Sequence, residues 1–390
     1  MNIVYFDNAA TTKIRSEVLN EMIPYLTSNY GNASSLYSIG RTSKHAIDNA
    51  RAQVASLINC NPNEIYFTSC GSESDNTALK GIAFANKKKG NHIITSKIEH
   101  PAILESCKFL EKQGFDISYI NVDSDGFINL QELENAIRPT TILISIMFAN
   151  NEIGSVLPIA EIGEACRAHG VLFHTDAVQA AGHIPVNVKK QNIDMLSLSA
   201  HKFHGPRGIG ALYVKRGIEL ISLMEGGGQE RGKRPGTENL PAIMGMAAAL
   251  KEECTLMEQN EAKVIAMRDR LIQGLSQIPY SILNGSREKR LPGNVNFCFE
   301  GVSGESLLLL LDSRGICASS GSACASGALE PSHVLLSLGL APEIAQGSLR
   351  ISLDISNTEE EIDYMLEVIP QVVEQLRGMS DDWRKKHCED

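Results

Sequence analysis

The sequence predicts an α/β protein with a seven-stranded, mostly parallel sheet and a smaller α+β domain. Short runs rich in β-branched residues alternate with helical segments from about residue 60 to about residue 215. After residue 240, apolar residues recur at every third or fourth position, which is typical of a long helix. The length of 390 residues is enough for two domains.

Seven apolar runs are expected to form the strands of the sheet. Helical segments lie between most of them, for example at 74–90 and 158–170, so helices should cover both faces of the sheet. The predicted strands are 64–69, 92–96, 116–121, 141–149, 171–176, 194–199 and 210–215.

The second half of the chain has a different pattern. A long helix is expected at 240–278, followed by short strands at 294–299 and 348–353 and helices at 306–311 and 359–378. We therefore expect a large domain at 14–255, and a small domain formed by 1–13 and 256–390, with the long helix as the bridge.

Composition excludes several classes of protein. The net charge is −10 and no basic run is longer than three lysines, so no nucleic-acid partner is expected. The longest strongly apolar run is five leucines, far short of the ~20 residues that cross a bilayer, and the N-terminus has no signal-peptide pattern. The nine cysteines include no C-x-x-C motif, which favours a reducing cytoplasm without disulfides or structural zinc.

Two charged side chains lie where predicted strands end. Lys202 comes soon after the strand 194–199, and Asp176 ends the strand 171–176. Ligands of open α/β sheets bind at this edge. Pyridoxal phosphate needs a lysine for a Schiff base and an acid that keeps its pyridine nitrogen protonated. Lys202 could instead be a solvated loop residue, and Asp176 could instead cap a helix.

Two more strand ends carry groups that suit the same cofactor. Gly71 makes a tight turn and a helix is expected to open at Ser72, which creates an anion site for a phosphate. Ser72 and Asp75 also match an ordinary capping box, so this signal alone is weak. His100 could stack on a planar ring and exchange protons, or it could be structural. All four strand ends together favour a pyridoxal-phosphate site.

A cysteine lies in an unusual segment near the C-terminus. Residues 318–327 contain almost no large side chains, so they should form an exposed loop, and Cys324 lies among them. Free cysteines usually prefer burial. Cys324 is therefore a candidate nucleophile, and the alternative is an accidental surface thiol.

These residues belong to segments that resemble the cysteine desulfurases of the class-V aminotransferase group, which are fold type I enzymes dependent on pyridoxal phosphate. The resemblance spans nearly the whole chain in the family's order. The loop around Cys324 resembles that of the group linked to iron–sulfur cluster assembly. The matching segments are "YFDNAATT" at 5–12, "YGNASS" at 30–35, "TSCGSESDN" at 68–76, "EHPAIL" at 99–104, "NNEIG" at 150–154, "HTDAVQ" at 174–179, "SAHKFHGPRGIGALYV" at 199–214, "GGGQERGKRPGT" at 226–237, "SSGSACASG" at 319–327 and "LRISL" at 349–353.

Some positions depart from the family pattern. Cys70 stands where glycine is common, Ala33 where proline is, and Pro235 where a small residue is, but none of these changes removes a catalytic group. The C-terminal segment 380–390 does not resemble the extended tail with which housekeeping members dock a cluster scaffold.

The resemblance implies a role for each matching residue. Lys202, Cys324 and His100 would be catalytic, with Lys202 bound covalently to the cofactor, His100 stacked on its ring and Cys324 taking the sulfur. Asp176 would pair with the ring nitrogen and Gln179 with the phenolic oxygen. The remaining positions would hold the phosphate (Gly71, Ser72, Ser199, His201, and Thr237 from the partner subunit) or the substrate's carboxylate (Asn151, which would also contact the cofactor, and Arg350, with Asn32 nearby).

The segment 226–237, which carries Thr237, is polar and rich in glycine. It has too few apolar groups for a core of its own, so we expect the partner subunit of a homodimer to order it.

The resemblance implies a cytoplasmic enzyme that converts L-cysteine to L-alanine. Its sulfur would leave as a persulfide on Cys324 and pass to an acceptor protein such as an iron–sulfur scaffold. No metal site is implied, apart from a nascent cluster that Cys324 could approach. The alternatives are an aminotransferase or selenocysteine lyase on the same fold, and a non-catalytic partner that only relays sulfur.

Overall fold

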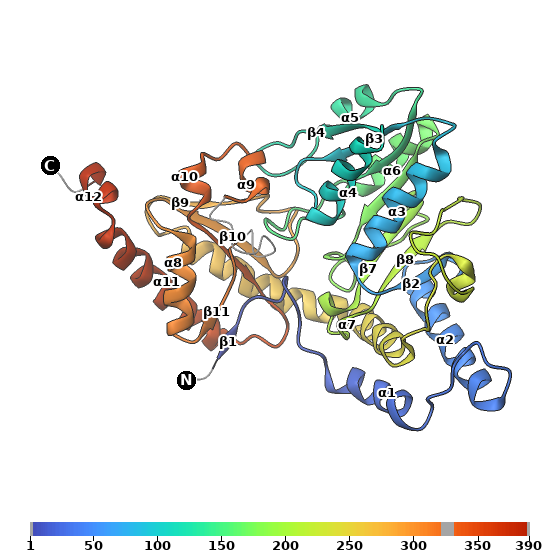
Figure 1. Ribbon diagram of the computed structural model, residues 1–390. Coiled ribbons are helices and arrows are strands. Elements are labelled where there is room, and N and C mark those ends of the chain that lie inside the picture. The colour runs from blue at the N-terminus through green and yellow to red at the C-terminus, as the bar shows by residue number, and fades with distance from the viewer. Residues whose placement is uncertain (1–2, 321–330, 388–390) are drawn as a thin grey trace.

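The computed structural model describes residues 3–320 and 331–387 (Figure 1). Its largest sheet has seven strands, and all seven predicted runs supply one strand each, with ends that differ by a few residues. In sheet order the strands are β2 (Ile65–Thr68), β8 (Gly210–Val214), β7 (Met195–Ser199), β6 (Leu172–Asp176), β5 (Thr141–Ser145), β3 (His92–Ser96) and β4 (Asp116–Ile120).

The direction of the strands decides where their ends meet. β4, β3, β5, β6 and β7 run parallel to one another, whereas β8 is antiparallel to both β7 and β2. The carboxyl ends of β3, β6 and β7 therefore lie along one edge of the sheet, which is the edge where open α/β sheets bind ligands.

Helices cover both faces of this sheet, as the alternation of strands and helices predicts. On one face, α3 (Gly71–Asn86) and α4 (Pro101–Lys112) bury apolar side chains against β3, β5, β7 and β8. The other face is covered by α2 (Ser38–Leu57), α5 (Leu130–Ala136), α6 (Ile159–His169) and the first half of α7 (Leu240–Leu275), and α1 (Ser16–Thr27) packs on α7.

A second, three-stranded antiparallel sheet lies beside the first. Its strands, in order, are β12 (Ser348–Ser352), β10 (Asn294–Phe299) and β9 (Ser281–Leu283), and the predicted strands at 294–299 and 348–353 are confirmed. The predicted helices are also present, as α8 (Gly304–Ser313) and α11 (Glu359–Met379). A pair of short parallel strands, β1 (Val4–Tyr5) and β11 (Ile316–Cys317), and three short helices, α9 (His333–Ser337), α10 (Pro342–Ala345) and α12 (Asp381–His387), complete this half.

The long helix α7 connects the two halves of the molecule. Figure 1 shows it running from the seven-stranded sheet toward the three-stranded one. Apolar side chains between Leu240 and Leu250 are buried in the core of the first half, and others between Val264 and Leu275 are buried in the core of the second. The predicted domain boundary at residue 255 falls inside this helix and stays a prediction.

Two observations bear on where the protein works. Within the described residues, no helix has both the length and the apolar character that crossing a membrane requires. All seven cysteines in the described part of the chain are free thiols.

Candidate active site

Three strand ends bring Lys202, Asp176 and His100 to one edge of the large sheet. Lys202 lies in a 3₁₀ turn, η2 (Ala200–Lys202), directly after β7, and Asp176 is the last residue of β6. His100 follows β3 and caps the N-terminus of α4, where its Nδ1 accepts a hydrogen bond of 3.1 Å from the main-chain N–H of Ala102. This convergence is the one that the parallel order of strands predicts.

The side chain of Lys202 points to the N-terminal segment of the chain. Its Nζ donates to the main-chain oxygens of Ala9, at 2.6 Å, and Ala10, at 2.8 Å. Gln179 Nε2 also donates to the oxygen of Ala9, at 3.0 Å. Lys202 and Gln179 therefore converge on one carbonyl group, which was not among the predicted site residues.

Asp176 is a buried carboxyl group at this edge of the sheet. One of its oxygens accepts a hydrogen bond of 2.9 Å from the N–H of Val178, but a turn and not a helix follows, so the alternative of a helix cap is wrong. Burial raises the pKa of Asp176, while the nearby imidazole of His100 opposes this change. A cation placed against Asp176, such as a protonated pyridine nitrogen, would stabilise its ionised form.

The proton of the neutral His100 ring lies on Nε2, because Nδ1 accepts the bond that caps α4. Burial lowers the pKa of His100, and Lys202 and His333 lower it further, against the effect of Asp176. The ring is therefore neutral near pH 7, which suits stacking on a planar group and proton exchange.

Asp75 belongs to this cluster, although the sequence pattern assigns it to a capping box. The helix α3 begins at Gly71 with Cys70 as its N-cap and no side-chain cap, so the capping-box alternative is wrong. Asp75 is buried, and its ligand atom, one from His100 and one from Asp176 all lie within 4.8 Å of one another. Burial, followed by the charge of Asp176, raises the pKa of Asp75 well above its usual range. The two carboxyl groups therefore resist being ionised together.

The start of α3 forms a cradle for an anion. A Cβ atom at Gly71 would lie 2.8 Å from the side chain of Val178, so the chain passes too closely for any larger residue. Ser199 faces the same glycine, and its Oγ is buried without a hydrogen-bond partner among the described residues. Ser72, on the first turn, is exposed. The N–H groups of the first turn and an unsatisfied hydroxyl together fit a phosphate.

His201 lies next to this cradle. Its Nδ1 is 3.2 Å from the hydroxyl of Thr11, and burial together with the charges of Lys202 and Arg207 lowers its pKa to about 4. A neutral imidazole at this place can donate a hydrogen bond to an anion.

Arg350, on β12, is the buried cation of the site. Its Nη1 donates to the main-chain oxygen of Asn151 at 3.1 Å, and its Nη2 to Asp7 at 2.9 Å. Its Nε is buried and has no hydrogen-bond partner in the described chain. The guanidinium of Arg350 already pairs with one carboxylate, that of Asp7. Its unsatisfied Nε donor is suited to bind a second carboxylate. The sequence pattern does not predict the role of Asp7.

Three predicted residues are not brought together with these groups. Asn32 lies on an exposed loop before α2, where its side chain accepts from the N–H of Ser34, and no hydrogen bond links it to the other site residues. Thr237 is exposed on the surface of the chain. Cys324 lies outside the described residues.

The segment 226–237 forms ion pairs within its own chain, and the expectation that a partner subunit orders it stays a prediction. Glu230 forms two bonds of 2.7 Å to the guanidinium of Arg51, and both residues are buried. Arg234 bonds to Glu73 at 2.9 Å. These ion pairs join residues far apart in sequence, so the composition of the segment alone could not predict them.

The two described ends of the segment that contains Cys324 are fixed beside the site. Ser319 exchanges two main-chain hydrogen bonds with Arg350, of 3.1 and 2.6 Å. After the gap, Ser332 Oγ donates to Glu152 at 2.5 Å, and His333 Nε2 bonds to the oxygen of Glu99 at 3.0 Å. Glu152 and Glu99 directly adjoin Asn151 and His100 in the sequence.

Comparisons with known proteins agree with this fold. Residues 4–365 match the family model "Aminotransferase class-V". The chain is 56% identical over 377 residues to the cysteine desulfurase IscS of Methanosarcina thermophila. The matched region covers 97% of this chain and 93% of the relative. A solved NifS-like protein matches with a TM-score of 0.91 and 39% identity, over 96% of this chain and 100% of the other. The solved structure of SspA in complex with cysteine matches with a TM-score of 0.80 and 38% identity, over 91% and 99%.

The chain therefore belongs to the class-V aminotransferase family, whose fold implies dependence on pyridoxal phosphate. Within that family it belongs to the cysteine desulfurases.

Proposed function

We propose that the protein takes the sulfur atom from L-cysteine, releases L-alanine and holds the sulfur as a persulfide on Cys324. The observation that carries the proposal is the position of the two ends of the segment 321–330. They are bonded to Arg350 and to the residues that adjoin Asn151 and His100. The two described ends of this segment therefore lie beside a buried arginine that already pairs with a carboxylate.

Covalent geometry supports this role. Cys324 follows Ser320 by four residues, and four residues of extended chain span at most ~14 Å. Ser319, which directly precedes Ser320, is paired with Arg350. Cys324 is therefore within reach of a substrate that Arg350 holds.

The residues at the sheet edge suit pyridoxal phosphate. Lys202 would bind it covalently, Asp176 would pair with its ring nitrogen and His100 would stack on the ring. When bound, the cofactor supplies an acceptor for the electrons released at the substrate's α-carbon. Its other contacts would come from Gln179, Asn151, Gly71, Ser72, Ser199 and His201.

The chain's own groups would then divide the reaction between them. Arg350 and Asn151 would hold the carboxylate of L-cysteine, and Lys202 Nζ would remove the α-proton. The Cys324 thiolate would attack the substrate sulfur, so that the carbon–sulfur bond breaks and a sulfur–sulfur bond forms. One cysteine and one thiol thus give one alanine and one persulfide, without any external oxidant.

A free thiol titrates near ~8.5, so Cys324 needs a group that accepts its proton. We propose the neutral ring of His100 for this task; to accept the proton, its Nδ1 would have to release the N–H of Ala102.

A second copy of this chain is the partner that the surface supports. Large apolar side chains are exposed along α1, the loop after it and the start of α2, and again just before residue 226, although such side chains usually avoid water. They are Leu19, Ile23, Leu26, Tyr30, Leu36, Tyr37, Ile39, Ile221, Leu223 and Met224. Because Thr237 lies exposed on the segment that follows this patch, it would complete the phosphate site of the partner subunit.

Mixing two inactive variants tests the shared site. A Lys202→Ala subunit lacks the covalent lysine, and a Thr237→Ala subunit lacks the proposed phosphate contact, but a hybrid dimer contains one site with both residues. We expect some alanine formation to return after subunit exchange. Proven exchange without any recovered activity would contradict a site shared between subunits.

The acceptor of the sulfur would be a protein, and an iron–sulfur scaffold is the one we propose, with Cys324 approaching the nascent cluster. The free thiols of the described chain support a reducing compartment, which we propose to be the cytoplasm. No nucleic acid or membrane is part of the proposal.

The products distinguish this proposal from its alternatives. We expect the purified protein to absorb near the edge of the visible range, and to form alanine and protein-bound persulfide in equal amounts from L-cysteine. An aminotransferase would instead give a keto acid, and a selenocysteine lyase would be active with L-selenocysteine but not with L-cysteine. A protein that only relays sulfur would show neither the absorbance nor alanine.

A further inference from the structure

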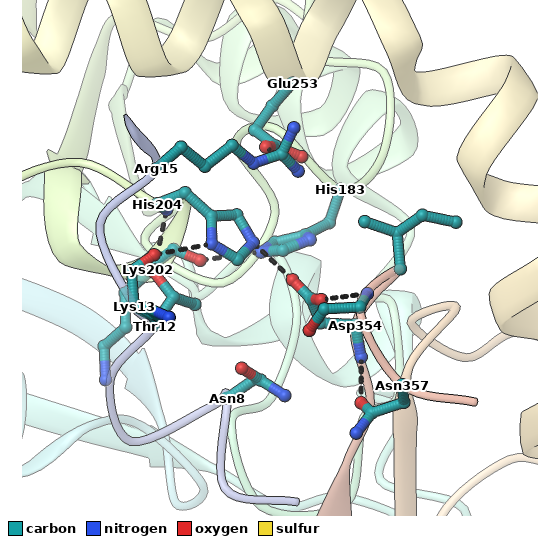
Figure 2. Close-up of polar contacts among 12 residues, drawn as sticks. Asn8, Thr12, Lys13, Arg15, His183, Lys202, His204, Glu253, Asp354 and Asn357 are labelled. Carbon is teal, nitrogen blue, oxygen red and sulfur yellow. Dashed lines mark hydrogen bonds and ion pairs between the residues drawn. The ribbon is translucent and has the colours of Figure 1, made fainter. Parts of the chain in front are cut away.

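A buried ion pair lies directly behind Lys202, where the two sheets meet (Figure 2). His204 follows Lys202 by two residues, and Asp354 follows β12, the strand of Arg350, by two residues. His204 Nε2 lies 2.5 Å from Asp354 Oδ2, and each residue is only 7% exposed. The proposed mechanism above gives this pair no role.

The geometry determines the charge of His204. Its Nε2 faces the carboxylate of Asp354, and its Nδ1 lies 2.9 Å from the main-chain oxygen of Lys13. A carbonyl oxygen and a carboxylate can only accept, whereas a neutral imidazole has a single N–H to donate. Both bonds are satisfied only when the ring is an imidazolium.

The electrostatics agree with this geometry. Burial lowers the pKa of His204, but its hydrogen bond to Asp354 and the charge of that residue outweigh burial and raise the pKa. In the same way, burial raises the pKa of Asp354, but His204 and the N–H of Ser356 hold it well below its usual range.

The His204 side of the pair is connected to the backbone of Lys202. The carbonyl oxygen of Lys202 accepts a hydrogen bond of 2.9 Å from His183 Nε2. The N–H of His204 donates to Thr12 Oγ1 at 2.7 Å, and His204 has a φ of +62°, so the chain turns sharply directly after Lys202. A displacement of His204 would therefore move the backbone that carries Lys202.

The Asp354 side is equally fixed. The N–H of Asp354 donates to Asn357 Oδ1 at 2.9 Å, and Asn357 Nδ2 donates to the oxygen of Tyr5 at 3.1 Å. The preceding residue, Leu353, bonds to the oxygen of Gly293 at 2.7 Å. Three residues, Ile351, Ser352 and Leu353, separate Asp354 from Arg350.

We propose that His204 is a positioning residue. Through its ion pair with Asp354, it fixes the position of Lys202, which follows the seven-stranded sheet, relative to Arg350 of the three-stranded sheet. This inference rests on the proposed function, in which Lys202 acts on a substrate that Arg350 holds. A misplacement of about 1 Å between reacting groups costs on the order of 100-fold in rate, so a contact of this kind affects catalysis without touching the substrate.

The position of Lys202 relative to Arg350 should therefore depend on pH. Since the pKa of His204 is raised, the pair is complete below that pKa and is lost as the pH rises through it. The pKa of Asp354 is lowered, so the contribution of this carboxylate to the ion pair is lost only in strong acid. The other titratable or charged groups that face His204 are Glu253, Arg15 and His183. Arg15 lies 2.5 Å from Glu253, and burial raises the pKa of Glu253 to about 7. Burial lowers the pKa of His183.

The test uses the holoenzyme and compares Asp354→Asn, His204→Asn and the double variant with the parent. Asparagine keeps the shape of Asp354, and it tolerates the left-handed backbone of His204. Asp194→Asn is the control, because Asp194 bonds to Lys215 at 2.8 Å at the start of β7, at the opposite end of the strand from Lys202. The readouts are the imidazole NMR titration of His204, assigned with His204→Asn, and the KM and kcat for L-cysteine against pH.

We expect His204 of the parent to titrate above the ordinary value of ~6.5, and Asp354→Asn to lower its pKa by about one unit or more. We also expect kcat/KM to fall at least about 10-fold, mainly through kcat, with its alkaline limb at lower pH. The double variant should be no worse than either single one, because both break one contact. The control should leave the alkaline limb in place.

A parent His204 that titrates at or below ~6.5 would overturn the proposal, even if every variant failed to fold. So would an Asp354→Asn variant that loses thermal stability but keeps the parent's kcat and pH profile. If the parent forms no alanine, the proposed function fails, and the NMR titration still decides whether the charged pair exists.

Discussion

Replacing Lys202 with alanine is expected to abolish covalent attachment of pyridoxal phosphate and to lower alanine formation by a factor on the order of 10³ or more. Lys202 lies on the same sheet edge as Asp176 and His100, so its loss removes both the covalent link and the group that takes the α-proton. Folding should survive, because Lys202 Nζ bonds to the main-chain oxygens of Ala9 and Ala10 and holds no strand of either sheet in place through these bonds.

Borohydride reduction followed by peptide mapping measures the covalent link. The parent should carry the reduced cofactor on the peptide with Lys202, and the alanine variant should carry none. Lys215→Ala is a suitable control, since Lys215 bonds to Asp194 at the other end of β7 and should leave the cofactor in place. Reduced cofactor still attached to the Lys202→Ala protein would mean that another lysine holds it.

Replacing Cys324 with serine should stop sulfur transfer and leave the earlier steps intact. Serine has nearly the same size but lacks the soft, readily ionised sulfur nucleophile, so neither alanine nor persulfide should form at a useful rate. The variant should still fold, bind its cofactor and respond spectroscopically to L-cysteine. This combination is expected when a residue acts only in one step.

Cys388→Ser provides the matched control for this variant. Cys388, like Cys324, lies outside the described residues, and its replacement should leave alanine formation unchanged. If Cys324→Ser forms alanine as fast as the parent, Cys324 does not take the sulfur, and the activity is that of a general lyase.

Much of the fold follows from local sequence pattern. The seven strands were predictable because each is a short run rich in β-forming residues, and the parallel order of β3, β4, β5 and β6 follows from the helices between them. The convergence of Lys202, Asp176 and His100 was predictable for the same reason, since carboxyl ends of parallel strands share an edge.

The residues that sequence reasoning missed act over long distances along the chain. Asp75 matches a local capping pattern, and only the packing of α3 on the sheet brings it to Asp176. Asp7 bonds to Arg350 from the other end of the chain. Glu230 pairs with Arg51, 179 positions away, which the composition of its own segment does not reveal. Pairings of this kind depend on tertiary structure, which one sequence does not encode in any local pattern.

The most direct test is a single turnover of the holoenzyme with L-cysteine that carries isotopically labelled sulfur. Persulfides are then alkylated and the protein is mapped by mass spectrometry. We expect the label on the peptide with Cys324, with one alanine released for each labelled sulfur. Label on another cysteine, such as Cys70 beside Gly71, or free sulfide with an unmodified Cys324, would contradict the transfer of sulfur to Cys324.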